Sequence, residues 1–304
     1  MRHAAFEGKV TLRVDVDYPV GLERGVPRLL DALAAAGMQA TFFVVAGSNR
    51  PARAWTRLAR RDYLRRLWRL GPTRIARAFG GTLLGSGKML EAPAARAVLQ
   101  RIVAEGHELA IHGHDHAWWA EHVWSAPPAA AEREIERAYA AMRQATGRDD
   151  WAWGSPAWRT SDGVLRALEA RGVAYFSDCW GSEPFRTLDA REAPIAPPHL
   201  PITLPSLEAS LLELGLDEAR AVERALDGRP RDRYDLLCAH DYFEGLLRPR
   251  LFSRLLAGCA ERGLRCVTLE QTAHDLVASG APLPAGRLTR RRVPGFAGEA
   301  SWQA

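Results

Sequence analysis

Short apolar segments that end in charged or polar residues recur along this chain of 304 residues. Short apolar runs rich in β-branched residues are typical of buried strands in a parallel sheet. Five of these runs each lead to side chains that could bind a metal or take part in catalysis: Asp15 and Asp17, His112 and His116, Arg159, Asp178, and His240. Because the carboxyl ends of parallel strands meet at one edge, these distant residues can converge on one site.

The order of strand-like and helix-like segments predicts the fold class. A helix expected from Val26 to Ala36 connects an apolar strand at Val10 to Val16 with another at Ala40 to Val45, which is a β-α-β unit. About seven such units follow one another, so we predict an α/β fold with a distorted (β/α) barrel that need not be complete. We expect residues 1–280 to form a single catalytic domain. The basic, Pro/Gly-rich tail at 281–304 is expected to be irregular.

Composition excludes several classes of protein. The four cysteines form no CxxC pair, which argues against a disulfide scaffold and is compatible with a reducing compartment. The first nine residues lack the apolar core of a signal peptide. No segment approaches the roughly 18 apolar residues that a membrane span needs. We therefore expect neither a signal peptide nor a transmembrane helix.

A basic segment at about residues 50–80 interrupts the regular alternation of strands and helices. It holds ten arginines against one aspartate, although the whole chain carries a net charge of only +5. A helix with arginine on one side and tryptophan and leucine on the other suits an anionic membrane surface. An insert packed on its own domain remains an alternative, and nucleic acid is a weaker one that we do not expect. The residues predicted to meet the membrane are Trp55, Arg60, Arg61, Arg65, Arg66 and Trp68.

The side chains at the strand ends predict metal-assisted hydrolysis of an amide or ester. Asp17, His112 and His116 would give an open site with three protein ligands, as in catalytic zinc centres. Asp15 could take the proton of the attacking water, with Arg159 orienting it. His240 could donate a proton to the leaving group, with Asp178 raising its pKa. The Asp-x-Asp pattern also occurs in haloacid-dehalogenase-like phosphatases that use magnesium, but that interpretation leaves both histidines unused.

The five ordered motifs resemble those of the polysaccharide deacetylase superfamily (NodB-like, carbohydrate esterase family 4). The motifs are Asp15-x-Asp17, His112-x-x-x-His116, Arg159, Asp178-x-Trp180 and Leu237-x-x-His240. The resemblance implies a distorted (β/α) barrel and one divalent metal ion, with zinc as first choice and manganese, cobalt or nickel as alternatives. It assigns the same roles to the site residues. The third motif departs from the family's frequent Arg-x-Pro-Tyr, because here Pro156 precedes Arg159.

Further segments resemble a subgroup of that superfamily. These segments are Leu12 to Asp17, Gly25 to Leu30, Ser177 to Cys179, Pro184 to Arg186 and Pro201 to Pro205. The subgroup removes a formyl group from a polyprenyl-phosphate-linked amino sugar at the cytoplasmic face of the inner membrane. The resemblance implies that Trp180 and Arg186 contact substrate and that the protein is peripheral to that membrane. A deacetylase of another N-acetylated glycan is the second hypothesis, and a non-catalytic barrel that binds membranes or nucleic acid is the remote one.

Overall fold

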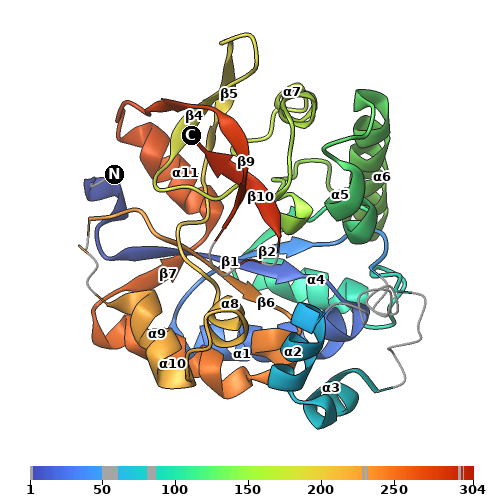
Figure 1. Ribbon diagram of the computed structural model, residues 1–304, viewed down its shortest axis with the longest axis vertical. Coiled ribbons are helices and arrows are strands. Elements are labelled where there is room, and N and C mark those ends of the chain that lie inside the picture. Colours follow the sequence, from blue (N-terminus) through green and yellow to red (C-terminus); the bar gives the residue numbers. More distant parts are fainter. Residues whose placement is uncertain are drawn as a thin grey trace.

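A parallel sheet with the strand order β3-β2-β1-β6 forms the centre of the protein (Figure 1). The computed structural model describes residues 3–49, 61–80, 87–227, 230, 232–293, 296 and 298–304. A fifth strand, β7, pairs in parallel with the first residues of β1. The strands are β1 at Lys9–Val16, β2 at Thr41–Val44, β3 at Glu108–Ile111, β6 at Leu236–His240 and β7 at Arg265–Val267.

The central strand β1 has an apolar face and a polar face. Successive side chains of a strand point to opposite sides. Leu12, Val14 and Val16 are buried in the main hydrophobic core. Arg13 and Asp15, which alternate with them, therefore face the other way, into the interior of the barrel.

Isolated backbone bridges extend the sheet into a distorted barrel. Beyond β3, Ile111 bridges to Trp153, Trp153 to Phe176, and Phe176 to His199, each in parallel. The amide of Leu236 in β6 donates to Thr203 Oγ1 at 3.0 Å and brings this arc back towards the sheet. The predicted α/β barrel is thus confirmed. One side consists of regular strands, and single bridges hold the other side together.

Helices cover the apolar face of the sheet. Figure 1 shows α1 and α10, which contact each other, below the sheet. Helix α1 ends where Gly37 adopts the left-handed conformation with φ of 64°. The covering helices are α1 at Val26–Ala36, α4 at Ala95–Ala104, α6 at Pro128–Thr146 and α10 at Pro249–Glu261. Helix α11 at Leu269–Ala278 lies on the other face of β1, where Thr272 Oγ1 is 2.8 Å from Thr11 Oγ1. Shorter helices are α5 at His116–His122, α7 at Asp162–Glu169, α8 at Leu207–Leu212 and α9 at Glu218–Leu226.

The basic segment forms two short helices, α2 at Arg61–Leu70 and α3 at Pro72–Phe79, separated at Gly71. Arg69 in α2 donates to the carbonyl of Leu212 in α8 at 2.5 Å, which attaches this helix to the domain. Trp68 remains 78% exposed. Of the predicted membrane residues, Trp55 and Arg60 lie outside the described residues, as do the side chains of Arg61, Arg65 and Arg66.

The C-terminal tail corrects one expectation, because much of it is ordered as strands. Strands β9 and β10 pair antiparallel, and β8 adds to the ribbon of β4 and β5. The backbone of Trp180 exchanges two hydrogen bonds with β10, from its amide to Ser301 and from Gln303 to its carbonyl. The Pro/Gly composition signalled the turns of this segment but not its pairing. These strands are β4 at Phe185–Leu188, β5 at Pro194–His199, β8 at Ala285–Gly286, β9 at Leu288–Arg292 and β10 at Glu299–Gln303.

Within the described residues, no helix combines the length and the apolar character that crossing a membrane requires.

Candidate metal and catalytic site

The three predicted metal ligands meet at the carboxyl ends of β1 and β3. Asp17 Oδ1 lies 3.7 Å from Nε2 of His112 and 3.7 Å from Nε2 of His116. Between the histidines, Gly113 adopts φ of 74°, which allows the chain to turn sharply after β3. Asp115 then caps α5 by accepting the amide of Trp118 at 2.8 Å, so the helix begins at His116. The strand end, the turn and the helix cap together place both imidazoles beside Asp17.

These three side chains fit a divalent metal. Asp17 Oδ1 is buried and has no hydrogen-bond partner among the residues that the structure describes. Bonds of about 2.1 Å in tetrahedral geometry separate two ligand atoms by roughly 3.4 Å, close to the observed spacing. Nδ1 of His112 donates to the Gly154 carbonyl at 2.7 Å, which leaves Nε2 free as a ligand. Burial lowers the pKa of His112 to about 4, so the imidazole is neutral at pH 7.

Arg13, which the sequence analysis did not select, holds Asp15. Its Nε donates to Asp15 Oδ1 at 2.5 Å and its Nη2 to Asp15 Oδ2 at 3.2 Å. The guanidinium is fully buried between the rings of Phe43 and Trp158, with its central carbon 4.2 and 4.1 Å from their centroids. Burial by itself would raise the pKa of Asp15, but the charge and hydrogen bonds of Arg13, together with the charges of His112 and His240, outweigh it and the pKa falls to about 2. Asp15 is therefore ionised at neutral pH.

Arg159 does not take the predicted position beside Asp15. Its guanidinium donates to the carbonyls of Ala120 and Glu299 and lies over the ring of Trp124. The backbone explains the difference, because Ala157 and Trp158 both have φ of 55° and turn the chain before Arg159. Arg159 thus contacts β10 at the outer surface, and Arg13 supplies the partner of Asp15 from within the same strand. An arginine inside an apolar strand, two residues before Asp15, was the available sequence signal.

His240, the predicted general acid, lies beside Asp15 on the strand next to β1, and not across the rim from it. The two residues are paired in the register of β6 and β1. Nδ1 of His240 is 3.2 Å from a carboxylate oxygen of Glu208, a buried residue of α8 that also accepts the hydroxyl of Tyr242 at 2.7 Å. Burial alone would lower the pKa of His240, but the carboxylates around it, with Glu208 first, raise it above its usual value. Glu208 therefore occupies the position that the sequence analysis assigned to Asp178.

Asp178 lies elsewhere in the interior, so its predicted pairing with His240 is wrong. Its Oδ1 accepts the amide of Ser155 at 2.5 Å, and its own amide donates to Nε2 of His199 at 3.2 Å. Burial raises its pKa to about 6. The preceding residues bridge to Trp153 and β5 rather than to β6, which directs Asp178 towards Ser155. Nothing in the sequence marked Glu208 for this role, because it follows a long loop and shares no motif with His240.

A pocket of about 100 Å³ opens next to His240. Of the two predicted substrate residues, Trp180 lines this pocket. Arg186 is not among the described residues that line it, and it donates instead to the carbonyl of Ala196 across the β4–β5 ribbon. The pocket is lined by Trp158, Trp180, Ile202, Ser206, Glu208, Ala209, Cys238, His240, Tyr242 and Phe296.

Two buried carboxylates and three histidines therefore converge at one edge of the barrel, and side chains of these types suit the hydrolysis of an amide. Residues 5–176 match the polysaccharide deacetylase family, so the chain belongs to that family. This membership confirms the predicted class of enzyme, a hydrolase acting on a carbon–nitrogen bond other than a peptide bond.

Two relatives carry the same, more specific name. The chain is 27% identical over 265 residues to the "Probable 4-deoxy-4-formamido-L-arabinose-phosphoundecaprenol deformylase ArnD" of Shewanella sediminis, covering 86% of this chain and 84% of the relative. It is 22% identical over 294 residues to the protein of that name from Wigglesworthia glossinidia brevipalpis, covering 93% and 98%.

Solved structures confirm the fold. A polysaccharide deacetylase structure from Mycobacterium smegmatis aligns with a TM-score of 0.63 at 19% identity, covering 95% of this chain and 96% of that one. The Bc1960 peptidoglycan N-acetylglucosamine deacetylase aligns with a TM-score of 0.53 at 13% identity, covering 90% and 91%.

Proposed function

We propose that this chain is a metal-dependent deformylase. Its substrate would be undecaprenyl-phosphate-linked 4-deoxy-4-formamido-L-arabinose, and its products formate and the free amino sugar used in lipid A modification and polymyxin resistance. The observation that carries the proposal is the position of Asp15 between a candidate metal ligand and the candidate general acid. An ionised carboxylate, Asp15, lies 3.6 Å from the metal-ligand candidate His112 and is paired in register with His240. The names of the two relatives support the choice of substrate.

Each residue of the site has a separate role in the proposed reaction. A divalent metal held by Asp17, His112 and His116, with zinc as first choice, would polarise the formyl carbonyl and make water more acidic. Asp15 accepts the proton of the water that attacks the formyl carbon. Arg13 keeps this carboxylate ionised and oriented through its two hydrogen bonds. His240 donates a proton to the amide nitrogen as the carbon–nitrogen bond breaks, and the nearby carboxylate of Glu208 favours the protonated imidazole.

The α2–α3 insert supports contact with a membrane surface, and we propose that this surface is the cytoplasmic face of the inner membrane. Leu64 and Trp68, four residues apart on α2, are 47% and 78% exposed. Phe79 at the end of α3 packs edge-on against Tyr18, with ring centroids 5.4 Å apart, and Tyr18 follows Asp17 directly. The insert thus connects an exposed apolar stripe with the rim of the site. We propose that Arg60, Arg61, Arg65 and Arg66 add attraction to anionic lipid.

Neutralising those four arginines tests the membrane part of the proposal. Co-sedimentation with anionic liposomes should fall, while hydrolysis of a soluble formamide should continue. Unchanged binding to liposomes would exclude this surface as the membrane contact.

A deacetylase of another N-acetylated glycan is the second candidate. Formyl and acetyl groups differ by one methyl, which a pocket distinguishes by only about 1–3 kcal/mol.

Product analysis by mass spectrometry distinguishes the candidates. The metal-loaded protein is incubated in detergent with the formamido-arabinose phosphoundecaprenol and, separately, with its acetamido analogue. Loss of the formyl group, abolished by chelation and by His112→Ala, is the expected result. If only the acetamido compound or chitin oligomers are hydrolysed, the proposed catalytic site would stand, but the formamido-arabinose lipid would be excluded as its substrate.

A further inference from the structure

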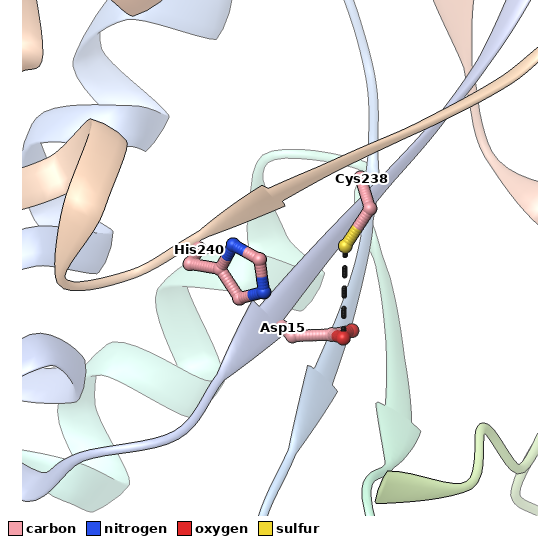
Figure 2. A group of neighbouring side chains, drawn as sticks. All are labelled: Asp15, Cys238 and His240. Carbon is pink, nitrogen blue, oxygen red and sulfur yellow. Dashed lines mark hydrogen bonds between the residues drawn. The ribbon is translucent and has the colours of Figure 1, made fainter. Parts of the chain in front are cut away.

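A second group of potential metal ligands lies on the other side of Asp15. One ligand atom from each of Asp15, Cys238 and His240 lies within 4.8 Å of the other two (Figure 2). The thiol of Cys238 is 3.6 Å from Asp15 Oδ2. None of these three residues is among the proposed ligands Asp17, His112 and His116, so the two groups are separate sets.

The pairing of β6 with β1 fixes this arrangement. Cys238 is opposite Arg13 and His240 is opposite Asp15 in the parallel register. Leu237 and Ala239, which alternate with them, pack in the main hydrophobic core, so Cys238 and His240 point into the barrel. Figure 2 shows both side chains directed from β6 towards Asp15 on β1. The three groups are therefore held by two neighbouring strands rather than by loops.

The thiol can be reached from the pocket. Cys238 and His240 both line the cavity of about 100 Å³, which is larger than the roughly 10–15 Å³ that one water needs. Ser206 and Glu208 line the same cavity and give it a polar side. A small ion can therefore approach Cys238, although the residue itself is only 4% exposed.

We propose that Asp15, Cys238 and His240 form a second, inhibitory binding site for a thiophilic divalent ion such as zinc. The inference rests on the proposed function, because an ion there would withdraw both the general base and the general acid from the reaction. A thiolate, an imidazole and a carboxylate are the three ligand types that zinc takes in proteins, whereas magnesium and manganese prefer oxygen. On binding, the thiol proton is released to solvent and sulfur coordinates as the thiolate.

Local charge makes this second site weaker than the first. Arg13 already donates to both oxygens of Asp15, and a second cation must compete with it. His112 Nε2 lies 3.6 Å from Asp15 Oδ2, the same oxygen that faces Cys238, so the two ions would be close neighbours. The carboxylates of Asp17 and Glu208 offset part of their repulsion. Inhibition should therefore begin only when metal exceeds one equivalent.

Cobalt(II) provides a direct test, because a cobalt–thiolate bond has a charge-transfer absorption that oxygen and nitrogen ligands do not produce. Titration of the metal-free protein should show two equivalents, with the thiolate band growing only during the second. Cys238→Ser should lose the band, whereas Cys266→Ser, at a buried cysteine paired with the first residues of β1, should keep it. A single equivalent, a missing band, or a band that persists in Cys238→Ser would overturn the proposal.

Inhibition is measured with excess zinc, relative to the rate of each variant with one equivalent. Cys238→Ser should need at least about tenfold more zinc for half inhibition than the wild type and Cys266→Ser, a change equal to about 1.4 kcal/mol. Equal sensitivity would refute the inhibitory role. If the protein shows the cobalt–thiolate band but hydrolyses no substrate, the second metal site would be supported and the proposed function would be refuted.

Discussion

Replacing Arg13 with methionine should destabilise the fold and raise the pKa of Asp15. The substitution removes two charge-assisted hydrogen bonds to Asp15, at 2.5 and 3.2 Å, and one to the carbonyl of Ser177 at 2.5 Å. Both partners are buried, with Arg13 fully inaccessible and Asp15 4% exposed. A buried charge that loses its partner costs about 3–5 kcal/mol. We expect a loss of that size in the free energy of unfolding at pH 7.

The sign of the pH effect follows from the pKa of Asp15. Arg13 and its neighbours lower this pKa from 3.8 to about 2, so their contribution to stability is complete above pH 3.8 and is lost as pH falls towards 2. In Arg13→Met, burial is no longer opposed by the guanidinium, and the pKa of Asp15 rises. The acidic limb of the profile of kcat/KM against pH should therefore move to higher pH.

Denaturant unfolding and the pH profile of deformylation measure the two effects. Arg159→Met is the matched control, because Arg159 contacts Trp124 and backbone carbonyls at the surface. Arg13→Lys keeps the charge without the planar fork, and should fall between wild type and Arg13→Met in both assays. An unchanged acidic limb in Arg13→Met, or an equal shift in Arg159→Met, would refute the reasoning.

Three further predictions concern other parts of the molecule. Glu208→Gln should lower the pKa of His240 and move the alkaline limb of the kcat/KM profile to lower pH; an unmoved limb would show that another group sets it. Burial lowers the pKa of His199 from 6.5 to about 3, so the contribution of His199 to stability should decrease as pH falls between these values, by up to about 1.4 kcal/mol per pH unit. His199→Gln should lose that slope in denaturant titrations at several pH values. Leu64→Ser combined with Trp68→Ser should weaken binding to anionic liposomes and leave hydrolysis of a soluble formamide unchanged.

The sequence was sufficient to predict which side chains at the ends of strands would form the site. Each apolar run that ends in a ligand places it at the rim of a parallel barrel, so Asp17, His112 and His116 could be grouped without a structure. The pairing of Asp15 with His240 was not predicted, because it depends on the order in which β1 and β6 stand in the sheet. These residues lie within or next to regular strands, where periodicity determines which way a side chain points.

The partners of those residues could not be predicted in the same way. Glu208 reaches His240 from α8, after a long loop, and only the folded chain brings them together. Asp178 was assigned by its place in a motif, but its contacts depend on single bridges that leave no periodic pattern. The strands of the tail were missed because their stability comes from pairing with each other and with Trp180 rather than from local propensity.

The third motif departs from the family's frequent Arg-x-Pro-Tyr, and the structure connects this departure with the buried Arg13. Ala157 and Trp158 both adopt φ of 55°, a conformation that costs non-glycine residues of order 1–3 kcal/mol each. That turn places the ring of Trp158 over the guanidinium of Arg13, 4.1 Å from its central carbon, and directs Arg159 to the carbonyl of Glu299 in β10. The loop of the third motif thus covers Arg13, which binds the general base Asp15, and its own Arg159 does not bind that base. Since Arg13 and Asp15 share one strand, their geometry is set by the sheet.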